Sequence, residues 1–145
     1  MKDNLAFWDA SAVVPLCIRQ NTSSRARQIL RRRQRQVVWW GTMAEVRSTF
    51  ARVLRSGQIT IKEKEQAVRH LQRLSGSWDE VAPDLALREM SIQLLDDYSL
   101  RTGDALQLAA ALFWCDRKPQ RRIFVCFDDR LADVAEKVGF NVIRA

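Results

Sequence analysis

The chain has 145 residues, enough for one domain of common size but too few for two ordinary ones. Hydrophobic residues make up 47% of it and charged residues 28%, which excludes a disordered or fibrous protein. The formal net charge of +7 comes mostly from arginine, the side chain best shaped for bidentate contacts with phosphate. Nucleic acid is therefore the leading candidate partner. A merely basic surface, or one that binds an acidic protein, is the alternative.

The cysteines, the apolar runs and the first residues of the chain indicate the cellular location that we expect. Cys17, Cys115 and Cys126 are scattered through apolar segments, without the paired spacing of zinc or redox motifs. No apolar run approaches the roughly 18 residues that a membrane span needs, and the first residues lead into a predicted strand rather than a signal peptide. We therefore expect a cytoplasmic protein with no membrane association.

The first half of the chain alternates between strand and helix patterns. An apolar run at residues 5–8 predicts a buried strand that ends abruptly in Asp9, and a β-branched and aromatic run at 37–40 predicts a second strand. Thr42 is expected to cap a helix directly after that second strand. Apolar residues at helical spacing predict helices at 10–19, 24–35 and 42–56, the middle one carrying arginines on its remaining faces.

The second half continues the alternation. Thr60 and Glu63 have the spacing of a capping box, Thr102 is expected to cap a largely apolar helix, and Gly139 is expected to end the last helix. The pattern predicts helices at 61–75, 84–98, 102–115 and 131–138, and strands at 78–82, 123–127 and 141–143. Strands that alternate with helices predict an α/β fold, here a parallel β-sheet of four to five strands flanked by about seven helices, in one domain over residues 1–145.

Acidic residues stand at four points where this arrangement predicts that strands end or helices begin. Asp9 and Asp128 directly follow apolar strands, whereas Glu45 and Asp104 lie in the first turns of helices. In a parallel sheet all of these points meet at one edge, and grouped carboxylates require a neutralising cation. Hard oxygen ligands favour Mg²⁺ or Mn²⁺. Any single one of these acids could instead serve only as a helix cap.

Four blocks of sequence then carry a resemblance to a known family: residues 7–14, 42–45, 100–106 and 125–131. Together they resemble a PIN domain, most closely the VapC-type ribonuclease toxins of prokaryotic toxin–antitoxin pairs. The resemblance implies a metal-dependent endoribonuclease that a cognate antitoxin protein holds inactive. It places the catalytic and metal-binding acids at Asp9, Glu45, Asp104 and Asp128, around one or two Mg²⁺ or Mn²⁺ ions.

Several residues near these acids could have more than one role. Asp129 adjoins Asp128, and either could face the metal. Residue 126 is cysteine where the family often has a small hydroxyl residue. Ser11 could orient a metal-bound water or simply cap its helix. The single histidine, His70, is expected to be structural or solvated, because no paired histidine motif accompanies it.

Basic residues supply candidate contacts to the RNA backbone, although charge runs are also typical of a solvated face. These candidates are Arg31, Arg32, Arg33, Arg35, Arg121 and Arg122.

A homodimer is also expected, because the apolar stripes of the helices at 42–56 and 61–75 exceed what a small sheet can cover. The leading hypothesis for the function is a metal-dependent toxin endoribonuclease. A catalytically weak RNA-binding or regulatory PIN domain is the second hypothesis. A receiver-type switch is remote, because it would need a lysine near the end of a late strand, and the last strand at 141–143 is followed by Arg144 and Ala145.

Overall fold

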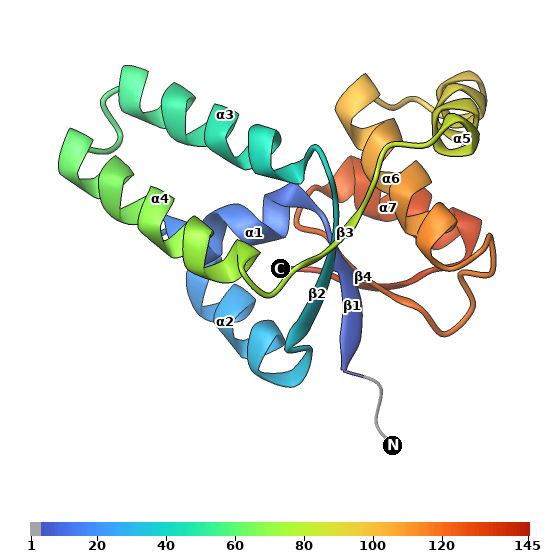
Figure 1. Ribbon diagram of the computed structural model, residues 1–145, viewed down its shortest axis with the longest axis horizontal. Coiled ribbons are helices and arrows are strands. Elements are labelled where there is room, and N and C mark those ends of the chain that lie inside the picture. The colour runs from blue at the N-terminus through green and yellow to red at the C-terminus, as the bar shows by residue number, and fades with distance from the viewer. Residues whose placement is uncertain (1–3) are drawn as a thin grey trace.

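The structure, a computed structural model, describes residues 4–145. Within them five parallel strands form one sheet in the order β3-β2-β1-β4-β5, and seven helices flank it, which confirms the predicted α/β class (Figure 1). The strands are β1 (Leu5–Trp8), β2 (Arg35–Trp39), β3 (Asp79–Val81), β4 (Ile123–Val125) and β5 (Asn141–Ile143). The helices are α1 (Ala10–Cys17), α2 (Ser23–Arg32), α3 (Thr42–Arg55), α4 (Ile61–Ser75), α5 (Leu85–Asp97), α6 (Thr102–Trp114) and α7 (Asp129–Val138).

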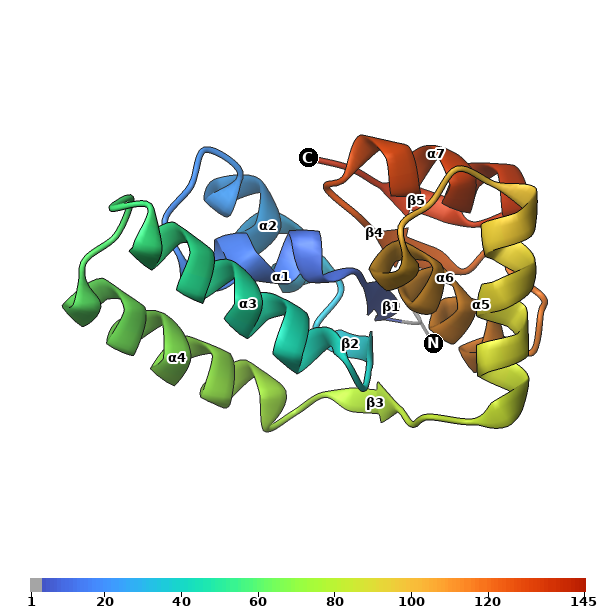
Figure 2. The same cartoon turned by 90° about the horizontal axis from the view of Figure 1, so that it is seen from above.

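The sheet is the middle of three layers, because its central strands are apolar on both faces. In β1, Ala6 and Trp8 pack into a core with α1, α3 and α4, whereas Phe7 points into the opposite core beside α5, α6 and α7. All three side chains are completely buried. Figure 2 shows the sheet passing between these two groups of helices.

Strand direction gives the sheet two chemically different edges. At the carboxyl edge β1, β2 and β4 end and α1, α3 and α7 begin; at the amino edge the same strands begin. The parallel register of β1 with β2 pairs Leu5 with Arg35, and that with β4 pairs Phe7 with Phe124, so the strand ends are level. In Figure 1 β1 runs upward, and α1 and α3 start beyond the upper ends of the strands.

Several predicted boundaries differ from the observed ones. The helix predicted at 24–35 ends at Arg32, because Arg35 pairs with β1, where its backbone N–H donates to the carbonyl of Asn4 at 3.3 Å. Thr42 and Thr102 are the first residues of α3 and α6 rather than caps, and neither helix has a side-chain cap. The short strand predicted at 78–82 is confirmed as β3.

The reason given for a homodimer is also corrected. The stripes of α3 and α4 need no partner chain, because these helices pack against each other and against α1. Val46, Phe50 and Leu71 from these stripes are at most 1% exposed. The large apolar side chains that do remain exposed lie elsewhere, among them Trp40 and Leu85.

Candidate active site

Asp9 is the most deeply buried of the predicted acids. It follows β1 directly, caps α1 with its Oδ2 accepting from the backbone N–H of Ser11 at 3.0 Å, and is only 4% exposed. The pKa of Asp9 is raised from 3.8 to about 6, chiefly by burial and in smaller part by the charges of Asp104 and Asp128. Capping a helix does not require the carboxylate to be buried, and burial disfavours its charged form. Capping alone therefore does not explain why Asp9 is buried.

Glu45 reaches the same region from the first turn of α3. Its Oε1 accepts a hydrogen bond from Gln107 Nε2 at 3.2 Å, and a Cβ placed on Gly103 would lie 3.7 Å from its Oε2. Burial raises the pKa of Glu45 to about 7, with the neighbouring charge of Asp9 as the next cause. Glu45 therefore lies between the start of α6 and Asp9.

The remaining two predicted acids complete the group. Asp104 lies in the first turn of α6, and its pKa is raised by burial and by the charge of Asp128. Asp128 caps α7, where its Oδ1 accepts from the backbone N–H of Leu131 at 3.0 Å. Asp129 points elsewhere: its side chain is 96% exposed and lies 3.6 Å from Arg144 Nη1. Of the two neighbouring aspartates, Asp128 is the one that interacts with the acidic group.

The acids thus form one electrostatic cluster without matching positive charge. Asp9 interacts with Asp104 and Asp128, and Glu45 interacts with Asp9 and Asp104. None of the four takes part in the ion pairs found within residues 4–145. Arg101 and Arg130, which the sequence-based choice of arginines left out, lower the pKa of Asp104. Arg101 lies three residues before Asp104 and Arg130 two residues after Asp128, and this proximity in the sequence is the signal that would have identified them.

The donor set fits a hard divalent cation in its chemistry. Carboxylate oxygens are the ligands that Mg²⁺ and Mn²⁺ prefer, and a cation would relieve the repulsion that raises these pKa values. In the part of the chain that the structure describes, however, no three Asp, Glu, His or Cys side chains form a ready-made metal site. The carboxylates would have to move closer together to share one ion.

Ser11 and Cys126 connect two of the segments that carry the acids. The Ser11 hydroxyl accepts from the backbone N–H of Phe127 at 2.9 Å, so it ties the start of α1 to the loop before α7. The Cys126 thiol lies 3.8 Å from Asp9 Oδ2 and 3.3 Å from the carbonyl oxygen of Asp128. Burial raises the pKa of the Cys126 thiol, which therefore stays protonated and able to donate.

Gln107 is a polar residue of the site that sequence reasoning missed. It is completely buried on α6, one turn after Asp104, and its Nε2 donates to Thr42 Oγ1 at 3.0 Å as well as to Glu45. Its own Oε1 has no hydrogen-bond partner among residues 4–145. A lone glutamine in the apolar stretch after Asp104 was the available signal, since a buried amide needs a specific partner. Gln107 holds the carboxylate of Glu45 against α6.

The arginines predicted to contact RNA do not lie beside these acids. Arg31 and Arg32 end α2, and Arg33 and Arg35 lead into β2. Arg121 and Arg122 immediately precede β4, so all six lie at the amino edge of the sheet. Their role at the acidic cluster is therefore not supported by their placement.

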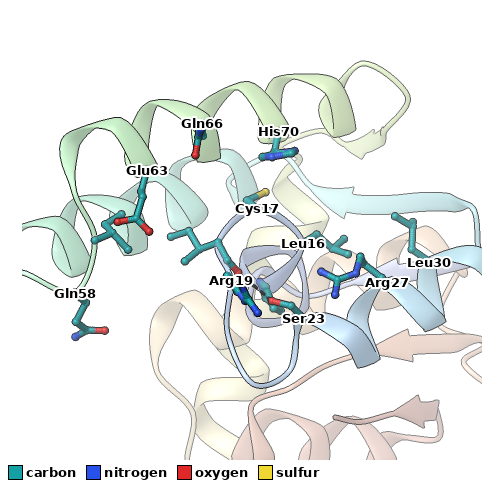
Figure 3. A pocket seen from close by; sticks show the side chains of 13 residues that line it. Leu16, Cys17, Arg19, Ser23, Arg27, Leu30, Gln58, Glu63, Gln66 and His70 are labelled. Atoms are coloured by element: carbon teal, nitrogen blue, oxygen red, sulfur yellow. Dashed lines mark hydrogen bonds between the residues drawn. The ribbon is translucent and has the colours of Figure 1, made fainter.

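A large hollow of the described surface is separate from the acids as well. It has a volume of about 800 Å³ and lies between the end of α1, the start of α2 and α4. In Figure 3 Glu63, Gln66 and His70 of α4 face Leu16 and Cys17. His70 is exposed, and Arg73 Nη2 lies 2.7 Å from its Nδ1. The predicted structural or solvated role of His70 agrees with this position at the rim, and none of the four acids lines the hollow.

Comparison with known proteins identifies the class to which this fold belongs. The model of the PIN domain matches residues 6–137, so the chain belongs to the PIN domain family, generally a metal-dependent nuclease fold. Among solved structures, the crystal structure of PAE2754 from Pyrobaculum aerophilum is similar over 97% of this chain and 90% of that one. Its TM-score is 0.64 and its sequence identity 17%, a likeness that concerns the fold alone. The comparison with curated proteins gave no match.

Among residues 4–145, no helix combines the length and the apolar character needed to cross a membrane.

Proposed function

We propose that the protein is a metal-dependent endoribonuclease whose active site is the cluster of Asp9, Glu45, Asp104 and Asp128. The observation that carries this proposal is the convergence of four carboxylates from separate segments, without paired cations, on a partly buried site. Such an arrangement destabilises the folded protein unless it has a ligand to hold, because like charges repel most strongly where water is excluded. PIN domain nucleases act on RNA, which agrees with the basic charge of the chain.

In this proposal each side chain has a defined task. The four carboxylates would hold one or two Mg²⁺ or Mn²⁺ ions, and the bound metal would activate water and offset charge on the leaving oxygen. Gln107 fixes the orientation of Glu45, and Ser11 holds the loop before α7 against the start of α1. Arg101 and Arg130 supply positive charge beside Asp104, where a phosphate oxygen could be bound.

The test is cleavage of a labelled single-stranded RNA of mixed sequence by the purified protein. We expect internal cleavage with Mg²⁺ or Mn²⁺ and none with chelator. We also expect titration calorimetry to show metal binding that Asp9→Asn weakens. Cleavage that is equal in chelator and in Mg²⁺ would exclude the metal-dependent mechanism.

We further propose that this nuclease is the toxin of a toxin–antitoxin pair and acts in the cytoplasm. The resemblance of its four acid-bearing blocks to VapC-type toxins supports this role. Expression in a bacterial host should stop growth, whereas expression of the Asp9→Asn variant should not. Co-expression of the cognate antitoxin, to be sought in a small open reading frame beside this gene, should restore growth. A host that grows normally while it makes active nuclease would argue against the toxin role.

One observation favours the alternative of a catalytically weak RNA-binding or regulatory PIN domain. Within residues 4–145 the acids do not form a ready-made metal site. A weak domain of this kind would bind RNA equally well with and without Mg²⁺ and would leave it intact. The cleavage and calorimetry experiments above therefore separate the two proposals.

A homodimer is proposed on a different basis from the stripes of α3 and α4. Trp40 is 58% and Leu85 67% exposed, and both are near the carboxyl end of β3: the backbone N–H of Trp40 donates to the carbonyl oxygen of Val81 at 3.0 Å, and Leu85 follows Val81 by four residues. Such side chains are typical of a protein–protein interface. Light scattering should show a dimer, and Leu85→Glu should convert it to a monomer. A wild-type protein that stays monomeric up to millimolar concentration would contradict this.

A further inference from the structure

The amino edge of the sheet concentrates the positive charge of the molecule. Three segments meet there: the end of α2, the start of β2, and the loop from α6 to β4. Segments 31–35 and 115–122 contain a single acid, Asp116. We call their eight basic residues, a third of the 24 in the chain, the arginine edge: Arg31, Arg32, Arg33, Arg35, Arg117, Lys118, Arg121 and Arg122.

The register of the sheet arranges part of this edge as a row. Leu5 pairs with Arg35 on one side, and Arg122 precedes the β4 residues that pair with β1 on the other. Because neighbouring strands lie about 4.8 Å apart, the backbones of Arg35 and Arg122 are separated by roughly 10 Å. The intervening strand contributes only the apolar Leu5, so the row carries positive charge on both sides of it.

A hollow of about 260 Å³ opens within this edge. Arg33, Arg121, Arg122 and Asn141 line it, with Trp114 and Leu5 as its apolar wall. The guanidinium carbon of Arg122 lies 5.3 Å from the centre of the Trp114 ring, a cation–π contact that holds this side chain in place. The hollow thus combines guanidinium donors with planar groups on which a base can stack.

The arginine edge is distant from the acids. The four residues from Leu5 to Asp9 span about 13 Å at the usual rise of a strand, and helices cover both faces of the sheet between the two ends. A short RNA whose phosphodiester lies at the acids therefore does not reach the arginine edge. Beyond the phosphate oxygen that Arg101 and Arg130 could bind, the acids themselves repel phosphate, so most of the binding energy for a long RNA has to come from elsewhere on the protein.

We propose that the arginine edge is a second RNA-binding surface, which holds the backbone of a long RNA at a distance from the bond to be cleaved. This proposal rests on the proposed ribonuclease function, and it adds that binding and cleavage use opposite edges of one sheet. The favourable effect of basic residues at a helix C-terminus explains Arg31 and Arg32 but not the arginines of the α6–β4 loop.

Nucleic acid fits this surface better than an acidic protein does. The charges form an extended row with an aromatic wall, which is typical of surfaces that follow a phosphate backbone and stack bases. An acidic protein would more often meet an apolar core surrounded by charge. Among the large exposed apolar side chains, Phe113 lies two residues before segment 115–122 of the arginine edge, and the others lie outside both of its segments: Trp40, Ile61, Leu85, Ile92 and Leu95.

The experiment compares two triple variants with the same loss of charge. In the first, Arg31→Gln and Arg32→Gln are combined with Arg121→Asn, because Arg121 has a positive φ of 65°, which asparagine tolerates. The matched control replaces Arg52, Arg55 and Arg69 of α3 and α4 by Gln. All six arginines are exposed, so both variants should fold, and thermal melting checks this.

Binding of an RNA hairpin with long single-stranded arms is measured against salt in the Asp9→Asn background, with chelator present. We expect the slope of log affinity against log salt to fall by roughly 2 in the first variant, about 0.7 for each lost phosphate contact, and to change little in the control. Equal slopes in the two variants would overturn the proposal and attribute binding to overall charge. An unchanged slope in the first variant would also overturn it, leaving this edge to a protein partner.

Cleavage then separates this proposal from the proposed function. With Asp9 intact and Mg²⁺ present, the first variant should cleave the long RNA with a higher KM, while its cleavage of a trinucleotide is unchanged. If the unaltered protein cleaves neither RNA, the ribonuclease proposal fails, but the salt slopes still decide whether the arginine edge binds RNA. An equal loss of cleavage for both RNAs in the first variant would contradict a surface separate from the active site.

Discussion

The two edges of the sheet carry opposite charge in different physical states. At the carboxyl edge Asp9 is 4% exposed, and burial raises the pKa values of three acids. At the amino edge most arginines are exposed, and Arg35 forms an ordinary surface ion pair with Asp79. Helix dipoles favour acids at the first edge and cations at the second, so the sign of the charge alone is weak evidence for function. The burial of uncompensated charge is the stronger evidence.

The largest effect is expected at Asp128, and its neighbour Asp129 provides the comparison. Asp128 interacts with the cluster, whereas Asp129 faces Arg144 and solvent. We expect Asp128→Asn to lower kcat/KM for RNA cleavage by at least about 100-fold, because even outer partners of metal ligands cost 10–100-fold. Asparagine can still cap α7, so the melting temperature should change little.

The matched control for that prediction is Asp129→Asn, which changes the same charge one residue away. It should leave cleavage unchanged. Loss of activity in Asp129→Asn together with retention in Asp128→Asn would mean that the loop before α7 turns the other aspartate to the metal. Loss in neither would remove this segment from the active site.

The second prediction concerns the stability of the metal-free protein against pH. The pKa of Asp9 is raised from 3.8 to about 6 in the folded protein, so the folded state holds its proton more tightly than the unfolded state. The tighter proton binding contributes to the stability of the folded state fully below about pH 4, and this contribution is lost as pH rises through 6. Relative to wild type, Asp9→Asn should therefore become more stable as pH rises, by about 3 kcal/mol for a shift of 2 units.

Urea denaturation of both proteins with chelator, at pH 4 and pH 8, measures that difference. The comparison with the variant measures Asp9 together with its coupling to Glu45, whose pKa the charge of Asp9 raises. A difference in stability that does not depend on pH would show that Asp9 titrates normally. Mg²⁺ at pH 8 should stabilise the wild type more than the variant, since only the wild type keeps all four carboxylates.

The third prediction uses two buried glutamines, one beside the acids and one remote from them. Gln107 contacts Thr42 and Glu45, whereas Gln36 of β2 accepts from Trp78 Nε1 at 2.9 Å. Gln107→Met should reduce cleavage by about 10–100-fold and move the pH profile to higher pH. In the wild type the hydrogen bond from Gln107 lowers the pKa of Glu45. Its removal raises that pKa, so Glu45 ionises at a higher pH.

The control is Gln36→Met, a similar change in a similarly buried side chain. Because both variants bury methionine in place of an amide, a comparable change in melting temperature is expected. Cleavage by the Gln36 variant should be that of the wild type, with an unshifted pH profile. If both variants lose activity in proportion to their stability, Gln107 has a structural role only.

Much of the carboxyl edge could be predicted because local sequence specifies it. Asp9 ends an apolar strand, and Asp104 lies in the first turn of an apolar helix. In a parallel α/β sheet, both patterns predict a position at the carboxyl edge. The contact from Phe127 N–H to Ser11 could not be predicted, because these residues are 116 positions apart. Gln107 was missed for the same reason, as its partners belong to α3.

The amino edge was predicted less well because its pattern is ambiguous. Arginines at 31–35 fit the surface of a continuing helix as well as the approach to a strand, and only the pairing of Arg35 with β1 ends the helix. The expectation that α3 and α4 need a partner chain was wrong for a similar reason. Their apolar stripes are visible in the sequence, but the packing of α1 against both helices is not. Which apolar stripe packs on which helix is a tertiary property that hydrophobic periodicity does not specify.

The smallest effect is expected at the ion pair of the amino edge. Arg35 Nη2 lies 3.1 Å from Asp79 Oδ2, with the two side chains 61% and 55% exposed. A double-mutant cycle with Arg35→Gln and Asp79→Asn should give a coupling below about 1 kcal/mol that falls further with salt. Because the pair is weak, Arg35 can exchange Asp79 for a phosphate at little cost. Asp79→Asn alone should then tighten binding of the long RNA, and weaker binding would mean that Asp79 orients Arg35 rather than competing for it.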